Sequence, residues 1–294
     1  MMPSCLVFSS GGARGIAHFG AIDVLRRRGM LANVKCCVGS SAGAIAAAAV
    51  ALGVHPRLVM REALRRYPPP GLKATFENWE SGFGVSSDAV MDWAIDVALG
   101  ARADIRLGDV LGVHGIRLVL ATSDVASAKT VYLTGSTHPT LALREALKMS
   151  CAIPFVFGAR RLGNMVLVDG AMTDYFPLAR GIEEAHGGDV LGVCLDTATA
   201  TDAIDETPTS TTKTTTTVPP LYGDVVAFAI ALISCAVQNQ RGRVCTSDGA
   251  ARAVVRVLFP AGDLTTLSAS QDWMRDAFVR GARATKLQLT LNQR

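Results

Sequence analysis

Short apolar runs alternate along the chain with segments in which apolar residues recur every three or four positions. The run Cys5–Phe8 predicts a buried strand that leads directly into a glycine-rich turn. Ile16–Arg28 then has apolar residues such as Phe19 and Leu25 on one face, and three arginines and a glycine where it ends. Basic residues followed by glycine are typical of a helix C-terminus. The chain therefore begins as strand, turn and helix.

The same alternation continues through the rest of the chain. The expected strands cover residues 35–38, 116–121, 129–133, 165–168, 190–195 and 253–259, with 116–133 forming a hairpin around 122–128. The expected helices cover residues 41–52, 56–66, 88–99, about 140–149, 224–238 and a C-terminal stretch from about 268. Strands and helices in this order predict an α/β fold with a largely parallel sheet.

The composition changes abruptly at residues 199–220, which are rich in Thr, Asp, Pro and Ser. Such a segment cannot form a packed core, so we expect a mobile insertion or linker. Residues 225–237 are uncharged and apolar, but a bilayer-spanning helix needs about 20 residues. A buried core helix is the favoured interpretation there, and a membrane contact from one side is the alternative. We predict one domain over residues 1–294, with a core at 4–196, an insertion at 199–220 and a helical portion at 221–294.

Composition and charge exclude several classes of protein. The 294 residues are 49% hydrophobic and 18% charged, the opposite of a disordered chain. A net charge of +4 with 6% aromatic residues argues against a dedicated nucleic-acid-binding protein. The seven cysteines are unevenly spaced without a C-x-x-C pair, so neither a disulfide framework nor a zinc site is expected. Because the N-terminus also lacks the pattern of a signal peptide, we expect a cytoplasmic protein, in a reducing compartment.

The first candidate for chemistry is the pattern G-x-S-x-G made by Gly39, Ser41 and Gly43, between a predicted strand and an Ala-rich helix. Small residues on both sides of the serine let strand and helix cross closely and push the side chain outward. The positive end of the following helix would stabilise negative charge beside it. Ser41 is therefore a candidate nucleophile, although an ordinary Gly/Ser turn can produce the same pattern.

A second glycine element, SSGGARG at residues 9–15, also lies between a predicted strand and a helix. Consecutive glycines expose backbone N–H groups that can hold an anion, either a phosphate or the oxyanion of acyl transfer. A nucleotide site is disfavoured because Ser10 occupies the first glycine position of G-x-G-x-x-G and no acidic residue closes the strand at 35–38. An oxyanion hole beside Ser41 explains both turns.

A serine nucleophile needs a base, and the sequence offers two kinds. His186 could complete a Ser-His-Asp triad, but Ser41 follows only two predicted strands, which fits an α/β-hydrolase order poorly. Asp169 ends the strand MVLVDG just before Gly170, where its side chain would leave the edge of the sheet, and Asp174 competes for the same role. A plain Asp-Gly turn is the alternative without chemistry.

Four segments occur in an order that resembles the patatin-like phospholipases. They are GGARG at 11–15, GSSAG at 39–43, SCAIPFVF at 150–157 and VDGAMTDYFPL at 168–178. The resemblance covers about residues 4–196 and implies a three-layer α/β/α sandwich with a central, mostly parallel sheet. It also implies a lipid acyl hydrolase, similar to phospholipase A or lysophospholipase, which uses a Ser-Asp dyad and an acyl-enzyme intermediate.

The resemblance carries roles to individual residues. It implies that Ser41 is the nucleophile and Asp169 the base, without a metal or cofactor. The oxyanion hole would use Gly11, Gly12 and Ala13, with Arg14, Gly15, Gly39, Gly43 and Gly170 as supporting motif residues and His18 in a structural position. The implied partner is a lipid or phospholipid substrate, reached by transient contact with a membrane surface, and not a nucleic acid.

One departure leaves a rival function open. Ser10 stands where the family usually has the first of three glycines, which permits a catalytically inactive lipid-binding or interaction protein on the same fold. Arg14 and Arg26–Arg28 are candidate contacts to lipid phosphates, although exposed arginines at a helix end are more often only solvated.

Overall fold

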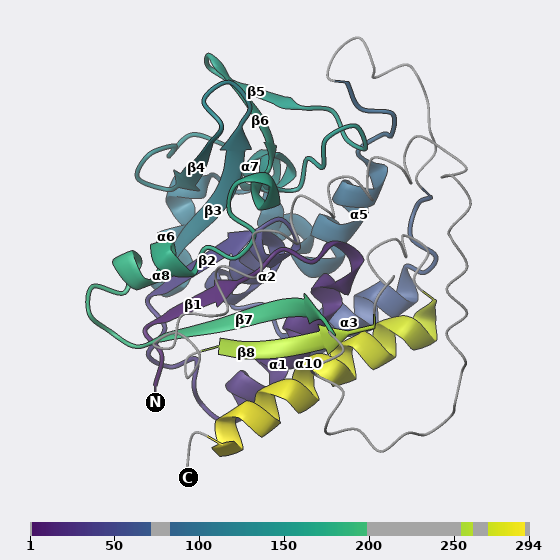
Figure 1. Cartoon of the computed structure of the whole chain (residues 1–294), viewed down its shortest axis with the longest axis vertical. Helices are drawn as coiled ribbons and strands as arrows, with labels where there is room; N and C mark the ends of the chain where they lie inside the picture. Colours follow the sequence, from purple (N-terminus) through teal and green to yellow (C-terminus); the bar gives the residue numbers. More distant parts are fainter. Residues whose placement is uncertain (1, 72–82, 199–253, 261–269, 292–294) are drawn as a thin grey trace.

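The chain folds around one mixed β-sheet, shown in Figure 1. This computed structural model describes residues 2–71, 83–198, 254–260 and 270–291. Within these residues the sheet has eight strands in the order β5-β6-β3-β2-β1-β7-β8, with β4 also paired to β3. The strands are β1 (Cys5–Phe8), β2 (Cys36–Ser40), β3 (Arg117–Asp124), β4 (Lys129–Thr134), β5 (Arg160–Leu162), β6 (Met165–Asp169), β7 (Val190–Thr197) and β8 (Val254–Phe259).

The strands β8, β7, β1, β2 and β3 form a continuous parallel unit. At one end of this unit β4 and β6 run antiparallel to β3, and β5 runs antiparallel to β6. The parallel core of the sheet is as predicted from the alternation of strands and helices. The antiparallel strands extend it on the side where Asp169 lies.

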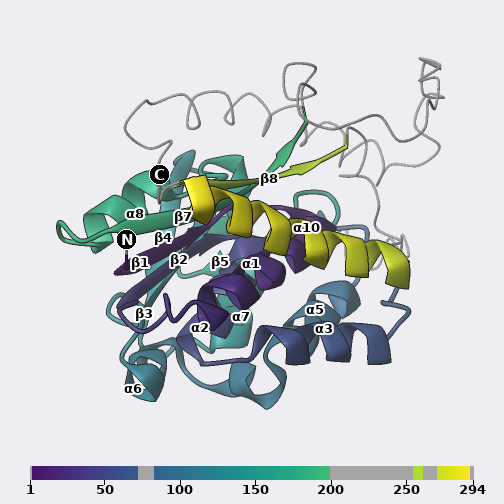
Figure 2. The same cartoon turned by 90° about the horizontal axis from the view of Figure 1, so that it is seen from below.

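Helices cover both faces of the sheet, which confirms the predicted three-layer α/β/α sandwich (Figure 2). They are α1 (Ile16–Arg27), α2 (Ala42–Ala51), α3 (Pro56–Arg65), α5 (Ala89–Ala98), α6 (Val110–His114), α7 (Leu143–Ser150), α8 (Leu178–Glu184) and α10 (Gln271–Leu291). The larger core lies between the sheet and the layer that contains α1 and α2, whereas a smaller core lies under α8. Residues of β1 alternate between the two, with Phe8 in the larger core and Val7 in the smaller.

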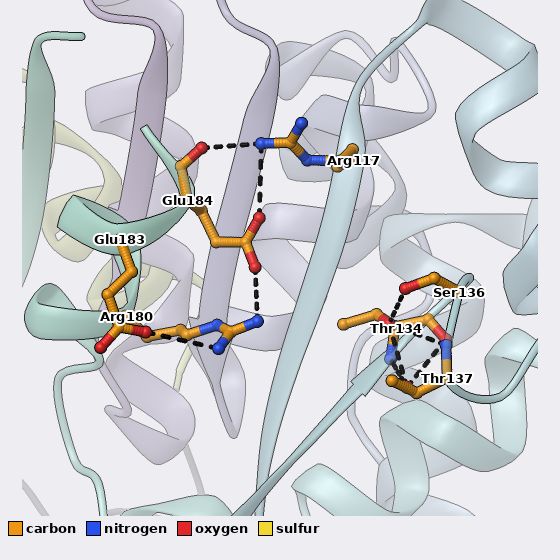
Figure 3. Close-up of polar contacts among 7 residues, drawn as sticks. All are labelled: Arg117, Thr134, Ser136, Thr137, Arg180, Glu183 and Glu184. Atoms are coloured by element: carbon orange, nitrogen blue, oxygen red, sulfur yellow. Dashed lines mark hydrogen bonds and ion pairs between the residues drawn. The ribbon is translucent and has the colours of Figure 1, made fainter. Parts of the chain in front are cut away.

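An ion pair between Arg117 and Glu184 holds α8 on its face of the sheet, and Arg180 makes further ion pairs within α8, as Figure 3 shows. Arg117, the first residue of β3, donates from Nη2 to the carbonyl oxygen of Glu184 at 2.7 Å and lies 3.3 Å from its carboxylate. Arg180 pairs with the same carboxylate at 2.5 Å and with Glu183 at 3.3 Å. The end of α8 is therefore fixed at the edge of the sheet where the parallel strands begin. In the same figure the hydroxyls of Thr134, Ser136 and Thr137 close the turn that follows β4.

Most predicted elements are present, with two kinds of difference. The strand β5 and the short helices α6 and α8 were not expected from the sequence. The hairpin is confirmed, but β3 continues to Asp124 because Thr122, Ser123 and Asp124 pair with β4 on one side and with β6 on the other.

The predicted Thr-rich insertion at 199–220 and the predicted helix at 224–238 lie outside the described residues. The expected strand and helix after them are present as β8 and α10. The division into core, insertion and C-terminal portion stays a prediction. None of the described helices combines the length and the hydropathy required to cross a membrane.

Candidate active site

Ser41 lies at a sharp turn between β2 and α2. Its backbone has φ 54° and ψ −122°, a strained conformation for a residue with a side chain. A Cβ on Gly39 would collide with the backbone of Gly43, and a Cβ on Gly43 would collide with the carbonyl oxygens of Phe8 and Ser9. Only glycine fits at both positions, because α2 crosses directly over the ends of β1 and β2. The expected strand–turn–helix geometry of G-x-S-x-G is present.

The strand register brings Asp169 level with Ser41 across β3. Ser40 pairs with Ala121, and the next residue of β3, Thr122, pairs with Asp169 at the end of β6. Ser41 Oγ donates a hydrogen bond to Asp169 Oδ2 over 2.6 Å. The two residues are 4% and 3% exposed. The structure thus joins the two side chains that the sequence proposed as nucleophile and base.

The carboxylate of Asp169 is oriented by its own neighbours. Its Oδ1 accepts from the N–H of Ala171 at 2.8 Å, and its backbone carbonyl accepts from Ser123 Oγ at 2.9 Å. Burial raises the pKa of Asp169 to about 6, against the opposing effect of the hydrogen bonds from Ser41 and Ala171. At neutral pH the group is therefore mainly a carboxylate with an increased affinity for a proton. Gly170 is required next to it because a Cβ there would collide with Ala121.

Ser150, the last residue of α7, supports the turn from behind. Its buried hydroxyl accepts from the backbone N–H of Ser41 at 3.0 Å and donates to the carbonyl oxygen of Ala121 at 2.7 Å. The turn is thereby tied to β3, the strand that also positions Asp169. Sequence reasoning included Ser150 only as the first residue of the segment 150–157 and gave it no role of its own. The signal that could have identified it is a serine at the end of an otherwise amphipathic helix.

The glycine element forms a short 3-10 helix, η1 (Gly12–Gly15), directly after β1. Gly12 has φ +55° and, with Ala13, lines the same cavity as Ser41. N–H groups at the start of a helix have no acceptor inside it, so those of Gly12 and Ala13 can serve an oxyanion. A Cβ on Gly15 would lie 2.7 Å from the Cβ of Ala42, which shows how closely η1 packs on α2. Gly11 precedes η1 with φ −174° and ψ −4°, and its own Cβ position faces Leu195.

The serine at position 10 is accommodated without disturbing this element. The N–H of Ser10 donates to the carbonyl oxygen of Tyr175 at 2.8 Å, and Ser10 is buried. The neighbouring Ser9 Oγ accepts from the N–H of Leu195 at 2.9 Å. The start of the loop is therefore bonded to β7 and to the segment after Asp169.

Arg14 does not face a lipid phosphate, contrary to one of our expectations. Its side chain is 1% exposed, with the guanidinium carbon 5.3 Å from the centre of the Phe259 ring. Its Nη1 donates to Thr197 Oγ1 at 3.3 Å. Arg14 thus anchors η1 to β7 and β8, because the loop turns this side chain inward.

The histidines form no triad with Ser41 in the structure. His18 donates from Nε2 to the carbonyl oxygen of Ser9 at 2.8 Å, and burial lowers its pKa to about 4, so it is neutral and structural. His186 follows α8, whose end is bound to Arg117 at the beginning of β3. Thr122, level with Ser41, lies about 16 Å further along that strand. The competing acid Asp174 instead accepts from Tyr132 Oη at 2.7 Å.

A cavity of about 200 Å³ opens beside Ser41. Apart from Ser41 its wall is almost entirely apolar, and it is contributed by η1, α1, α2, α3, α5, α10 and the segment after α7. The side chains include Phe19, Ile45, Val59, Ala63, Met91, Trp93, Ala94, Ala98, Phe157, Trp273 and Met274. For scale, a cavity of about 150 Å³ holds benzene. The site is shaped for an apolar group attached to a polar, reacting one.

The described residues contain no cluster of three or more His, Cys, Asp or Glu side chains suited to a metal ion. Five cysteines lie in the described part, and all five are free thiols: Cys5, Cys36, Cys37, Cys151 and Cys194. Cys151 lines the cavity beside Ser41, and burial raises the pKa of its thiol well above the usual range.

Fold and site together are typical of the α/β hydrolytic enzymes that carry a serine at a strand–helix turn. The family model described as patatin-like phospholipase matches residues 6–180. The chain belongs to this family.

The chain is also similar in sequence to proteins of several organisms. The chain is 32% identical to YqhO of Bacillus subtilis over 58% of its own length and 64% of that protein. It is 27% identical to an NTE family protein of Mycobacterium bovis, over 71% and 53% of the two chains. It is 23% identical to a probable lipid hydrolase, 463L, of Invertebrate iridescent virus 6, over 59% and 61%. The chain thus spans about half to two thirds of the length of these relatives.

The crystal structure of VipD from Legionella pneumophila has the same fold. The alignment has a TM-score of 0.59 at 17% identity and covers 99% of this chain and 67% of that one.

Proposed function

We propose that this protein hydrolyses carboxylic esters of lipids, as a phospholipase A or lysophospholipase does, with Ser41 as nucleophile and Asp169 as base. The observation that carries the proposal is the 2.6 Å hydrogen bond from Ser41 Oγ to Asp169 Oδ2 at the wall of an apolar cavity. Membership of the patatin-like phospholipase family supports the same reaction class.

The first half of the reaction forms an acyl-enzyme. Asp169 takes the proton from Ser41 as Oγ attacks the ester carbonyl carbon, and the carbonyl oxygen becomes an oxyanion. The N–H groups of Gly12 and Ala13, with Gly11 beside them, hold that charge, helped by the positive end of α2. Collapse of the tetrahedral intermediate breaks the bond to the alcohol, which leaves with the proton from Asp169.

The second half releases the fatty acid. Asp169, again a carboxylate, accepts a proton from a water molecule that attacks the acyl carbon. The bond to Ser41 Oγ then breaks and Oγ regains the proton. Every proton transfer in this cycle uses Asp169, so the cycle needs neither a histidine nor a cofactor.

The cavity supports a lipid as the source of the acyl group. A space of about 200 Å³ is a third larger than one that holds the six carbons of benzene, and so holds about eight carbons of one chain. Each methylene buried there contributes about 0.8 kcal/mol of binding. The enclosed part of the site therefore fits the carbonyl end of a single acyl chain.

Labelling with a fluorophosphonate probe, measured as intact mass, tests the proposal. We expect one adduct on the wild-type protein and none on Ser41→Ala. Ser40→Ala is the matched control, because this neighbouring buried hydroxyl should leave labelling unchanged. Asp169→Asn should lose ester turnover at least 100-fold, in the range of a general base.

Two results would contradict the proposal. An adduct that persists in Ser41→Ala would move the nucleophile elsewhere. A folded wild-type protein that takes up no probe would favour the inactive lipid-binding protein that the serine at position 10 left open.

A further inference from the structure

A second hollow, of about 420 Å³, lies on the surface between α1, α3 and α10. These helices lie side by side on one layer of the molecule (Figure 2). Among the described residues its lining has four cationic side chains, namely Arg27, Arg57, Arg283 and Lys286, and one carboxylate, Asp23. It shares no lining residue with the cavity beside Ser41.

The positive charge of this hollow exceeds what its carboxylate can balance. Asp23 is buried and binds Arg27 at 2.8 Å and Arg57 at 3.0 Å. Arg283 and Lys286 are exposed and pair with no carboxylate within the part of the chain that the structure describes. Guanidinium and ammonium groups that converge in this way bind phosphate oxygens.

The outer stripe of α10, defined as Val279, Arg283, Lys286 and Leu287, adds exposed apolar groups to these cations. The spacing of the four residues places them on one side of the helix. Val279 is 40% and Leu287 65% exposed, and Leu58 on the neighbouring α3 is 45% exposed. The opposite side of α10 is buried through Met274, Ala277, Gly281, Thr285 and Leu289. Cations beside exposed leucine and valine are typical of a helix that lies in a lipid interface.

The hollow lies close to the cavity beside Ser41. On α1, Phe19 lines the cavity and Asp23, one turn later, lines the hollow. On α10, Met274 lines the cavity and Phe278, one turn later, lines the hollow. One helical turn is about 5.4 Å, so a group bound in the hollow is held next to the helices that enclose the cavity beside Ser41.

We propose that the hollow and the outer stripe of α10 bind anionic phospholipid headgroups and dock the protein on a negatively charged bilayer. The phosphates lie against Arg283 and Lys286, with Leu58, Val279 and Leu287 in the interface. The site goes beyond the proposed hydrolysis, and its binding does not depend on Ser41 or Asp169.

Co-sedimentation with phosphatidylcholine vesicles, with and without phosphatidylglycerol, tests this site. Wild-type protein should bind the anionic vesicles more tightly, and less so at high salt. The double variant Arg283→Gln/Lys286→Gln should bind them about 30-fold more weakly, from about 1 kcal/mol for each cation. The matched control Lys129→Gln/Arg161→Gln removes two exposed cations elsewhere and should bind as the wild type does.

Three results would overturn the docking site. Equal binding to both kinds of vesicle would show that the anionic headgroup is not recognised. An equal loss of binding in the control variant would show that only the net charge of the protein matters. Displacement by inorganic phosphate, with Leu287→Ser still bound like the wild type, would mean a site for free phosphate instead of a bilayer. The double variant should keep its turnover of a soluble short-chain ester, so failure of docking and failure of the proposed hydrolysis are separate outcomes.

Discussion

Asp169 shows how a single residue is adjusted by its surroundings. Its side chain is buried, and this burial raises the pKa to about 6, above its ordinary value of 3.8. The hydrogen bonds from Ser41 and Ala171 oppose this shift without cancelling it. A carboxylate whose pKa lies near neutrality is a more effective base than one with an ordinary pKa. Enclosure of the site therefore favours the proton transfer that we propose.

The raised pKa predicts how activity depends on pH. Turnover needs the carboxylate form of Asp169, so kcat/KM should fall about tenfold per pH unit below pH 6. A soluble short-chain ester assayed from pH 4 to pH 9 measures this profile. A profile that stays flat through pH 6 while the protein remains folded would argue against Asp169 as the base.

The same shift predicts how stability depends on pH. A folded-state pKa above the unfolded value means that stability from the protonated carboxyl is present below about 4 and is lost as pH rises through about 6. The difference of about two pKa units between the folded and unfolded states corresponds to about 3 kcal/mol in the free energy of unfolding. In urea unfolding, the free energy of unfolding of Asp169→Asn should therefore rise relative to that of the wild type between about pH 4 and about pH 6. Asp109→Asn, at an exposed aspartate, should show no such gain.

Between elements, α1 and α10 cross with their backbones in close contact. A Cβ on Gly20 would collide with the carbonyl oxygen of Phe278, and one on Gly281 would collide with that of Ala17. Two glycines, far apart in sequence, therefore let the helix backbones touch. The crossing brings Trp273 and Met274 to the cavity beside Ser41 and holds the outer stripe of α10 at the surface.

Gly281→Ala tests this crossing. In an isolated helix alanine is favoured over glycine by about 1 kcal/mol, but here we expect a loss of about 1–3 kcal/mol because the backbones must separate. Urea unfolding measures the change. Gly112→Ala is the matched control, since Gly112 lies within α6 with open space around its Cβ position, and it should be neutral or stabilising. A Gly281→Ala variant as stable as this control would refute the close contact.

For the molecule as a whole, the cavity beside Ser41 is a product of the layered fold. Its wall combines α1, α2, α3, α5 and α10 with η1, from both ends of the sequence, while Ser41 comes from the carboxyl end of the central strand β2. Alanines contribute much of the open space, with Ala63 on α3 and Ala94 and Ala98 on α5. The length of acyl chain that fits should therefore depend on residues far from Ser41 in sequence.

Ala94→Phe should shorten the acyl chain that the site accepts. A ring that displaces two or three buried methylenes removes about 2 kcal/mol, or about 30-fold in kcat/KM, for an octanoyl ester. An acetyl ester does not reach that part of the cavity and should change little. Ala126→Phe, on an exposed turn, is the control. Equal losses for the octanoyl and acetyl esters would show that the substitution disturbs the catalytic groups instead of the cavity.

Local patterns in the chain were enough to predict much of this protein. The turn at Ser41 follows in part from contacts within a few residues, because a Cβ on Gly39 would collide with the backbone of Gly43. The alternation of apolar runs likewise predicted the parallel core. Such features depend on short-range steric contacts and on the periodicity of helices and strands.

The features that local patterns did not specify arise from contacts between distant parts of the chain. The hydrogen bond between Ser41 and Asp169 joins residues 128 positions apart through the register of β3. The inward position of Arg14 and the support from Ser150 depend in the same way on which surfaces pack together. Motif resemblance named Ser41 and Asp169, but the pKa that suits Asp169 to act as a base arises from burial, a property of the packed fold.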